Sequence, residues 1–214
     1  MYFLQRLFIF SFVSSLLACS SVQYGILEKV GIPKRDVMVY RVEKARDTQE
    51  ETKAQFKSAL AQFTAVTNFK GGDLETIYNQ LNSEYEASVS KAQEVSKRIA
   101  DIEDIAQALF SEWEQEITQY NNISLKHSSQ NKLNATKTHY RQLLSLMKSA
   151  ETKIKPVLRV FSDHVLFLKH NLNARAIASL KGELGIMKAD VSSLITSMEK
   201  SIHEANAFIN TMEK

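Results

Sequence analysis

The sequence predicts an all-α fold, an elongated antiparallel helical bundle or coiled coil of three to four long helices. The chain of 214 residues contains six glycines and two prolines, so few positions resist helix formation. Apolar side chains recur about every 3.5 residues over most of the chain, which is the period of a left-handed coiled coil. Both observations favour long amphipathic helices that share one hydrophobic core.

Residues 1–18 have the pattern of a lipoprotein signal peptide that precedes the helical body. Arg6 comes before an apolar run over residues 7–17, which is too short to span a bilayer as a helix. The run leads into Leu16-Leu17-Ala18-Cys19, which matches a bacterial lipobox and predicts lipid attachment at Cys19. A lone cysteine in an exported protein has no partner for an internal disulfide, and lipidation gives it a role. The alternatives are an ordinary secretory leader with a chance cysteine and an uncleaved anchor.

The predicted anchor places the mature chain in the bacterial cell envelope, facing the periplasm. By resemblance to the enterobacterial sorting rule, Ser20 after Cys19 favours the outer membrane. The 27 basic and 24 acidic side chains are nearly balanced, so the composition gives no reason to expect nucleic acid as a partner. The leader predicts one partner directly, which is the membrane that the lipid enters.

The mature chain divides into a tether, residues 19–35, and a helical bundle domain, residues 36–214. Glycine and proline in the tether disfavour helix. Its apolar side chains are expected to pack on the body or lie along the membrane surface, unless the segment is a semi-ordered linker. Asp36 is the expected N-cap of a first helix that ends near Phe69, with thin packing around its polar middle, residues 46–53. The core-facing side chains expected here are Val37, Tyr40, Phe56, Leu60, Phe63 and Val66.

A break at Gly71-Gly72 precedes the second helix, which Asp73 is expected to cap. This helix is expected to continue to Asn121-Asn122 as a rod of roughly 70 Å. Its apolar stripe keeps heptad spacing. The stripe consists of Leu74, Ile77, Leu81, Tyr85, Ser88, Ala92, Val95, Ile99, Ile102, Ala106, Leu109, Trp113, Ile117 and Tyr120.

A third helix is expected to begin between residues 124 and 129 and to keep its heptad phase as far as Leu172. Lys137 and Glu151 occupy two positions where this pattern expects apolar side chains. Pro156 lies inside the run, and because the phase continues past it we predict a kink and not a chain reversal. The stripe consists of Leu133, Tyr140, Leu144, Met147, Ile154, Leu158, Phe161, Val165, Leu168 and Leu172.

The heptad phase is lost after Leu172, and a new apolar stripe follows. A turn near residues 170–173 gives four helices of similar length, which suits an up-down-up-down bundle. Neither glycine nor proline marks that turn, so the alternative is one kinked helix over residues 125–212 in a more extended three-helix rod. The new stripe consists of Leu184, Met187, Val191, Leu194, Met198, Ile202, Ala205, Ile209 and Met212.

Five segments carry a resemblance to a known family. They are GIPKRD at residues 31–36, QFKSAL at 55–60, GGDL at 71–74, ALFSEWE at 108–114 and VLFLKHNLNARAIASL at 165–180. Together they resemble an uncharacterised gammaproteobacterial lipoprotein family, domain of unknown function 2959, over nearly the whole mature chain. Some members carry an automatic label as a DNA repair ATPase. This chain has no Gly-x-x-x-x-Gly-Lys-Ser/Thr loop, and an exported protein does not meet DNA.

The sequence contains no pattern typical of an enzyme or a metalloprotein. No two of its histidines, at positions 127, 139, 164, 170 and 203, are three or four residues apart, so none form a ready ligand pair on one helix face. It also lacks a Gly-x-Ser-x-Gly nucleophile elbow. Glu112, Glu114 and Glu116 alternate as on a solvated helix face, and Trp113 among them is expected to be a core aromatic. We therefore expect no enzyme activity, no cofactor and no metal.

One polar cluster interrupts the apolar stripe. It consists of Lys169, His170, Asn171, Asn173 and Arg175. One interpretation is a turn whose asparagines cap helix ends, or a polar layer that fixes helix register. The other interpretation is a patch that binds a partner or a ligand.

The expected function is that of a non-enzymatic envelope scaffold, tether or accessory protein. Long amphipathic helices can present a surface to another envelope protein, to cell-wall material, or to a second copy of the chain. The alternative is a ligand-binding or hydrolytic envelope protein with a polar groove near His170, also lined by His164, Asn171 and Arg175. A third hypothesis is a cytoplasmic coiled-coil protein whose leader has been misread.

Overall fold

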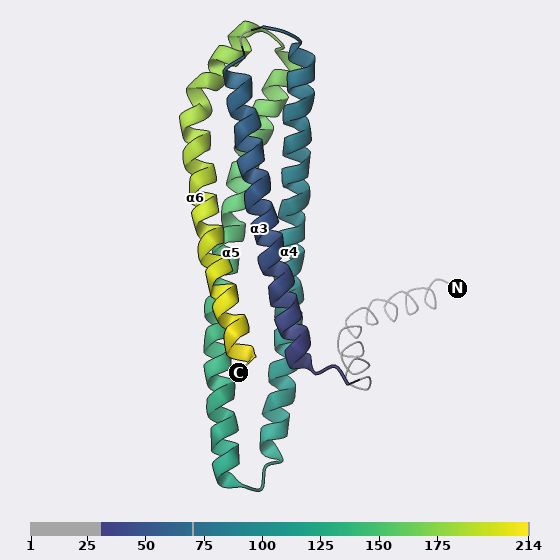
Figure 1. Cartoon of the computed structure of the whole chain (residues 1–214), viewed down its shortest axis with the longest axis vertical. Helices are drawn as coiled ribbons and strands as arrows, with labels where there is room; N and C mark the ends of the chain where they lie inside the picture. Colours follow the sequence, from purple (N-terminus) through teal and green to yellow (C-terminus); the bar gives the residue numbers. More distant parts are fainter. Residues whose placement is uncertain (1–30, 70, 214) are drawn as a thin grey trace, which may run out of the picture.

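The computed structural model describes residues 31–69 and 71–213, and every regular element in these ranges is a helix (Figure 1). The elements are α3 (Lys34–Thr67), α4 (Leu74–Thr118), α5 (Ile123–His170) and α6 (Ala174–Met212). The all-α prediction is confirmed. The chain turns between α5 and α6, so the described body is a four-helix bundle and not a three-helix rod. The predicted signal peptide, Cys19 and most of the tether lie outside the described residues.

The helix ends are set by local capping, and the first of them differs from the prediction. α3 begins at Lys34, directly after Pro33, so Asp36 lies in the first turn and is not the N-cap. Its carboxylate still favours the helix because it lies near the positive end of the helix dipole. The predicted cap of α4 is confirmed, since the Asp73 side chain accepts a hydrogen bond from the backbone N–H of Glu75 at 3.0 Å.

Each helix packs against two neighbours, so the four helices form a closed ring in cross-section. α3 lies against α4 and α6, and α5 lies against the same two helices. Two side-chain pairs fix the antiparallel direction of α3 and α6. Arg46 Nη1 donates to Asn206 Oδ1 at 3.2 Å, and Lys53 Nζ lies 3.8 Å from Glu199 Oε1. The result is the up-down-up-down arrangement that similar helix lengths suggested.

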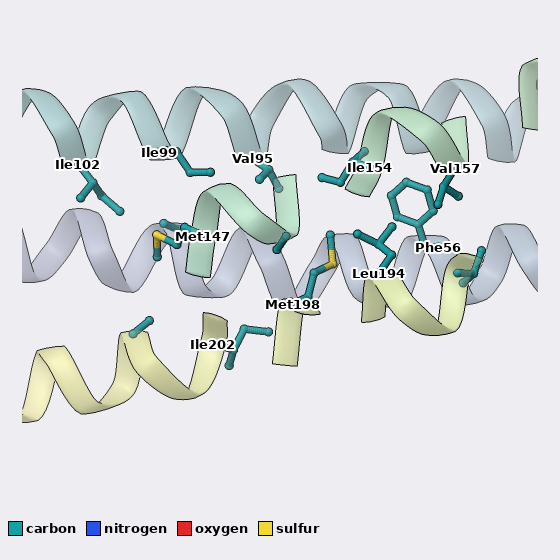
Figure 2. Packing of buried hydrophobic residues seen from close by; sticks show 14 of the residues in the cluster. Phe56, Val95, Ile99, Ile102, Met147, Ile154, Val157, Leu194, Met198 and Ile202 are labelled. Atoms are coloured by element: carbon teal, nitrogen blue, oxygen red, sulfur yellow. The ribbon is translucent and has the colours of Figure 1, made fainter. Parts of the chain in front are cut away.

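The core runs along the interior of the ring and takes side chains from all four helices (Figure 2). Apart from Thr48 and Thr67, the buried positions of α3 alternate between steps of four and three residues, which is a regular heptad. They are Met38, Val42, Ala45, Gln49, Thr52, Phe56, Ala59, Phe63 and Val66. The prediction that Tyr40 faces the core is wrong, because Tyr40 lies midway between the buried positions Met38 and Val42 and is 56% exposed. Val37 and Leu60 pack only on the margin of the core.

The polar middle of α3 is part of the core and not a thinly packed segment. Thr48, Gln49 and Thr52 are buried there. Thr52 Oγ1 donates to the backbone oxygen of Thr48 at 2.7 Å. The Gln49 side chain is only 1% exposed, and both its amide nitrogen and its oxygen lack a hydrogen-bond partner. The buried hydroxyl of Ser201 in α6 also lacks a hydrogen-bond partner, so both α3 and α6 carry unpaired polar groups in the core.

The stripes predicted for the other three helices are buried or partly buried, and their two exposed members lie at turns. Tyr120 follows the end of α4, Leu172 follows the end of α5, and both are exposed. The two polar interruptions in α5 are also explained. Lys137 pairs with Glu114 of α4, and Glu151 accepts a hydrogen bond from Ser96 Oγ at 2.5 Å.

α5 continues through Pro156, as predicted, and the chain does not reverse there. Proline has no backbone N–H, so α5 loses one hydrogen bond at Pro156. Pro156 lies on the exposed side of the helix, so this loss is not in the core. The kink itself stays a prediction. Among the described helices, none combines the length and the apolar character needed to cross a membrane.

The two ends of the bundle differ, and we name them by their turns. At the α4–α5 pole, α4 and α5 project as a two-helix hairpin beyond the first residue of α3 and the last residue of α6 (Figure 1). At the α5–α6 pole, the α3–α4 turn and the α5–α6 turn lie together and close the bundle (Figure 1). The described chain therefore begins near the base of this hairpin, roughly 50 Å along α3 from the opposite turn.

Candidate functional site

The predicted polar cluster forms the α5–α6 turn, and its asparagines cap helix ends. Asn171 is the C-cap of α5, and its Nδ2 donates to the backbone oxygen of Phe167 at 2.9 Å. Asn173 is the N-cap of α6, and its Oδ1 accepts from the backbone N–H groups of Arg175 and Ala176 at 3.1 and 3.0 Å. The structure therefore has the turn geometry of the first interpretation. It explains how the chain reverses without glycine or proline.

The same turn also presents an amphipathic surface. Lys169 and His170 lie exposed in the last turn of α5, and Arg175 lies exposed in the first turn of α6. Leu166, Phe167 and Leu172 lie exposed beside them. The exposure of Leu166 and Phe167 was not evident from the sequence, because both residues continue an apolar run. We call this surface the α5–α6 patch, and it consists of Leu166, Phe167, Lys169, His170, Leu172 and Arg175.

Replacing Asn173 with alanine is expected to lower the free energy of unfolding by about 1 kcal/mol, because α6 would lose its N-cap. Thermal denaturation followed by circular dichroism measures the change. Asn173→Asp should retain most of the stability, since a carboxylate accepts the same two N–H groups. His170→Ala, in the same patch, should leave the stability unchanged. Equal melting temperatures for Asn173→Ala and the unmodified protein would contradict the capping role.

His164 of α5 lies deeper in the bundle than the α5–α6 patch. Its ring centroid lies 5.0 Å from that of Phe63, at an interplanar angle of 34°. Its Nε2 is buried and has no hydrogen-bond partner. Burial lowers the pKa of His164 below its ordinary value of 6.5, and the carboxylates of Glu183 and Asp163 oppose that shift. Burial therefore favours the neutral form of His164, whose ring packs on Phe63.

This lowered pKa predicts that acid weakens the bundle. The unfolded chain binds the His164 proton below about pH 6.5, whereas the folded chain resists it. The folded state therefore keeps its full stability above the pKa that His164 has in the unfolded chain. It loses stability as the pH falls below that pKa, because the unfolded chain then binds a proton that the folded chain resists. Urea denaturation between about pH 7.5 and about pH 5.5 should show His164→Gln losing less stability than the unmodified protein. Parallel losses in the two proteins would show that His164 does not contribute.

A cavity of about 650 Å³ lies at the α4–α5 pole, where α3 begins and α6 ends. Trp113 lies at its wall, and its Nε1 donates to Ser129 Oγ at 2.9 Å. Lys34 Nζ lies 2.9 Å from Glu112 Oε1 across the cavity wall. The remaining lining residues are Pro33, Arg35, Leu109, Glu116, Lys132, Ala135, Thr136, Thr211 and Met212. Trp113 is thus only partly a core aromatic, because one side of it borders this cavity.

Two of the three neighbouring carboxylates at positions 112, 114 and 116 pair with basic side chains. Glu112 pairs with Lys34, and Glu114 pairs with Lys137. Within residues 31–69 and 71–213, no three His, Cys, Asp or Glu side chains come together as a metal site would require.

The family model described as protein of unknown function (DUF2959) matches residues 23–212. The chain belongs to this family. The match covers the whole bundle, including both poles, and it confirms the family resemblance of the five segments. No curated protein and no solved structure matches the chain significantly.

Proposed function

We propose that this family member is a non-enzymatic scaffold or tether of the bacterial envelope, held by a lipid on Cys19 and facing the periplasm. The lipobox sequence Leu16-Leu17-Ala18-Cys19 supports the anchor, and Ser20 favours the outer membrane. The described body is an elongated bundle with a hydrophobic core from all four helices, which suits a protein that spans a distance and positions a partner. The partner is another envelope protein or a second copy of the chain.

One observation carries the scaffold role: exposed apolar side chains lie at the pole opposite the one where α3 begins. Leu166 is 55% exposed and Phe167 is 41% exposed. Both residues belong to the last turns of α5, which Asn171 caps. A chain tethered through the start of α3 would hold the α5–α6 patch roughly 50 Å away along α3. Exposed apolar groups with neighbouring cations are typical of protein-binding surfaces.

Metabolic labelling with palmitate tests the anchor. The full chain should incorporate label and fractionate with the outer membrane, whereas Cys19→Ala should lose the label and leave the membrane fraction in part. Equal labelling of both chains would place the lipid elsewhere. A complete lack of label in the unmodified chain would refute the lipid anchor.

Site-specific photo-crosslinking in intact cells tests the α5–α6 patch. A crosslinker at Leu172 should give a defined adduct that Leu166→Ser and Phe167→Ser together abolish. An adduct of twice the mass of the chain would identify a second copy as the partner. Tyr40→Ser is the matched control, because Tyr40 is an exposed apolar residue outside the patch. An adduct that survives the patch substitutions would contradict the proposed role.

A second candidate function, ligand binding, is favoured by the cavity beside Trp113 and not by the surroundings of His170. A volume of about 650 Å³ is in the range of small-molecule sites. Trp113 is the only tryptophan in the chain, so its fluorescence reports on the cavity. Titration with a dansyl-labelled fatty acid should give saturable energy transfer from Trp113 if the cavity binds an apolar ligand. Its absence would remove this candidate.

A further inference from the structure

We propose that the α4–α5 turn is a second membrane contact, which places Tyr120, Ile123 and Leu125 in the lipid–water interface. Ile123 is 72% exposed, Leu125 is 55% exposed and Tyr120 is 43% exposed. All three lie within six positions of the chain, at the end of the projecting hairpin (Figure 1). We call them the hairpin tip. The inference uses the proposed anchor only to decide which pole faces the bilayer.

The hairpin tip has the chemistry of an interfacial contact. Tyrosine has an apolar ring and a polar hydroxyl, so it favours the boundary between headgroups and acyl chains. The isoleucine and leucine supply apolar surface. The turn also satisfies a backbone donor, because the Asn122 side chain accepts from the N–H of Leu125 at 3.1 Å. The tip can therefore enter a less polar environment without exposing that N–H group to lipid.

The charge around the hairpin tip is compatible with anionic headgroups. Between Glu116 and Lys132 the only permanently charged residue is Lys126. The sequence has no acidic residue from position 117 to position 150. The nearest carboxylates lie further up α4, and Glu114 among them is paired with Lys137. The α5–α6 patch differs, because acidic Asp163 and Glu183 lie near it along α5 and α6.

The position of the hairpin tip allows the contact. Lys34, the first residue of α3, forms an ion pair with Glu112 of α4, so α3 begins beside the base of the hairpin. α4 continues beyond Glu112 for roughly 10 Å. The tip therefore lies beyond the point where the described chain begins (Figure 1). Residues 20–33 can span at most about 50 Å when extended, so the tether is long enough for the tip to reach the membrane surface.

The size of the hairpin tip favours a lipid surface over a protein. A stable protein interface buries about 800 Å² on each partner, which three side chains at the end of a hairpin do not provide. A weak membrane contact suffices for a chain that is already anchored, because tethering makes the second contact intramolecular. Two contacts at one pole would hold the rod upright and point the α5–α6 patch away from the bilayer.

Lipid quenching of a labelled cysteine tests the inference. The full chain carrying Ile123→Cys is purified from membranes, labelled with a bimane fluorophore and reconstituted into vesicles of phosphatidylethanolamine and phosphatidylglycerol. A doxyl quencher is placed near the headgroup end of the acyl chains. The label should lose roughly half of its fluorescence, since interfacial side chains lie about 5–10 Å deep. Leu172→Cys, an exposed apolar residue of the opposite turn, is the matched control and should not be quenched.

The outcomes separate this inference from the proposed anchor. An unquenched label at position 123 would overturn the membrane contact, even if Cys19 carries lipid. Equal quenching at positions 123 and 172 would also overturn it, because the rod would then lie flat. The unmodified protein is labelled in parallel and its signal subtracted. Reaction of its Cys19 with the fluorophore would contradict the lipid anchor but would leave the result for the hairpin tip intact.

Discussion

Replacing Phe63 with alanine is expected to lower the free energy of unfolding by about 3–5 kcal/mol. Phe63 of α3 is fully buried, and its ring packs edge-on against Phe161 of α5 with the centroids 6.4 Å apart. It also stacks on His164. Truncation removes apolar area and leaves a cavity between two helices that are diagonal in the ring, so the bundle cannot close the gap easily. Urea denaturation followed by circular dichroism gives the change.

Tyr40→Ala is the matched control for this prediction. Tyr40 is an aromatic residue on the same helix, but it is 56% exposed, so its truncation should change the stability by less than about 0.5 kcal/mol. The comparison also tests the heptad phase of α3. A larger loss for Tyr40→Ala than for Phe63→Ala would mean that the opposite face of α3 is buried.

Replacing Gln49 with leucine is expected to raise the free energy of unfolding by about 1–3 kcal/mol. Both polar atoms of its side chain are buried without a hydrogen-bond partner, so the folded state bears their desolvation cost. Leucine fills a similar volume at a heptad core position and has no polar atoms to desolvate. The midpoint of urea unfolding should therefore move to a higher concentration with an unchanged slope.

Gln55→Leu is the control for Gln49→Leu. Gln55 lies on the same helix, but its Nε2 donates to Glu84 Oε2 at 2.7 Å and to the Glu84 backbone oxygen at 3.2 Å. Removing this paired amide should not stabilise the protein. A buried polar residue can also fix the register or the number of helices in a bundle. Sedimentation of Gln49→Leu should therefore be measured, and a loss of stability without a change in mass would contradict our explanation.

Much of the fold could be predicted because the hydrophobic periodicity of each helix is visible in its own sequence. The stripes of α4, α5 and α6 follow from spacing alone, and Gly71-Gly72 with Asp73 marks the first turn. The phase of α3 was misjudged, because its core positions include polar Gln49 and Thr52. A polar residue at a heptad position is indistinguishable from a surface residue until the neighbouring helices are in place.

The candidate surfaces were predictable only in part, for a related reason. The polar residues of the α5–α6 patch were evident as an interruption of the apolar stripe. The exposure of Phe167 and Tyr120 was not, because it depends on where one helix ends relative to its neighbours. Tyr120 continues the stripe of α4 in sequence, yet it belongs to the α4–α5 turn and is exposed. The hairpin that ends in this turn projects beyond the start of α3 and the end of α6 (Figure 1). Such an offset is a property of the assembled bundle.

The mass of the intact protein extracted from membranes tests the central claim, a helical rod held at the bilayer through Cys19. We expect a chain that begins at Cys19 and carries the added mass of a diacylglyceryl group and an acyl chain on that residue. A chain that still begins at Met1, with no mass added at position 19, would contradict it.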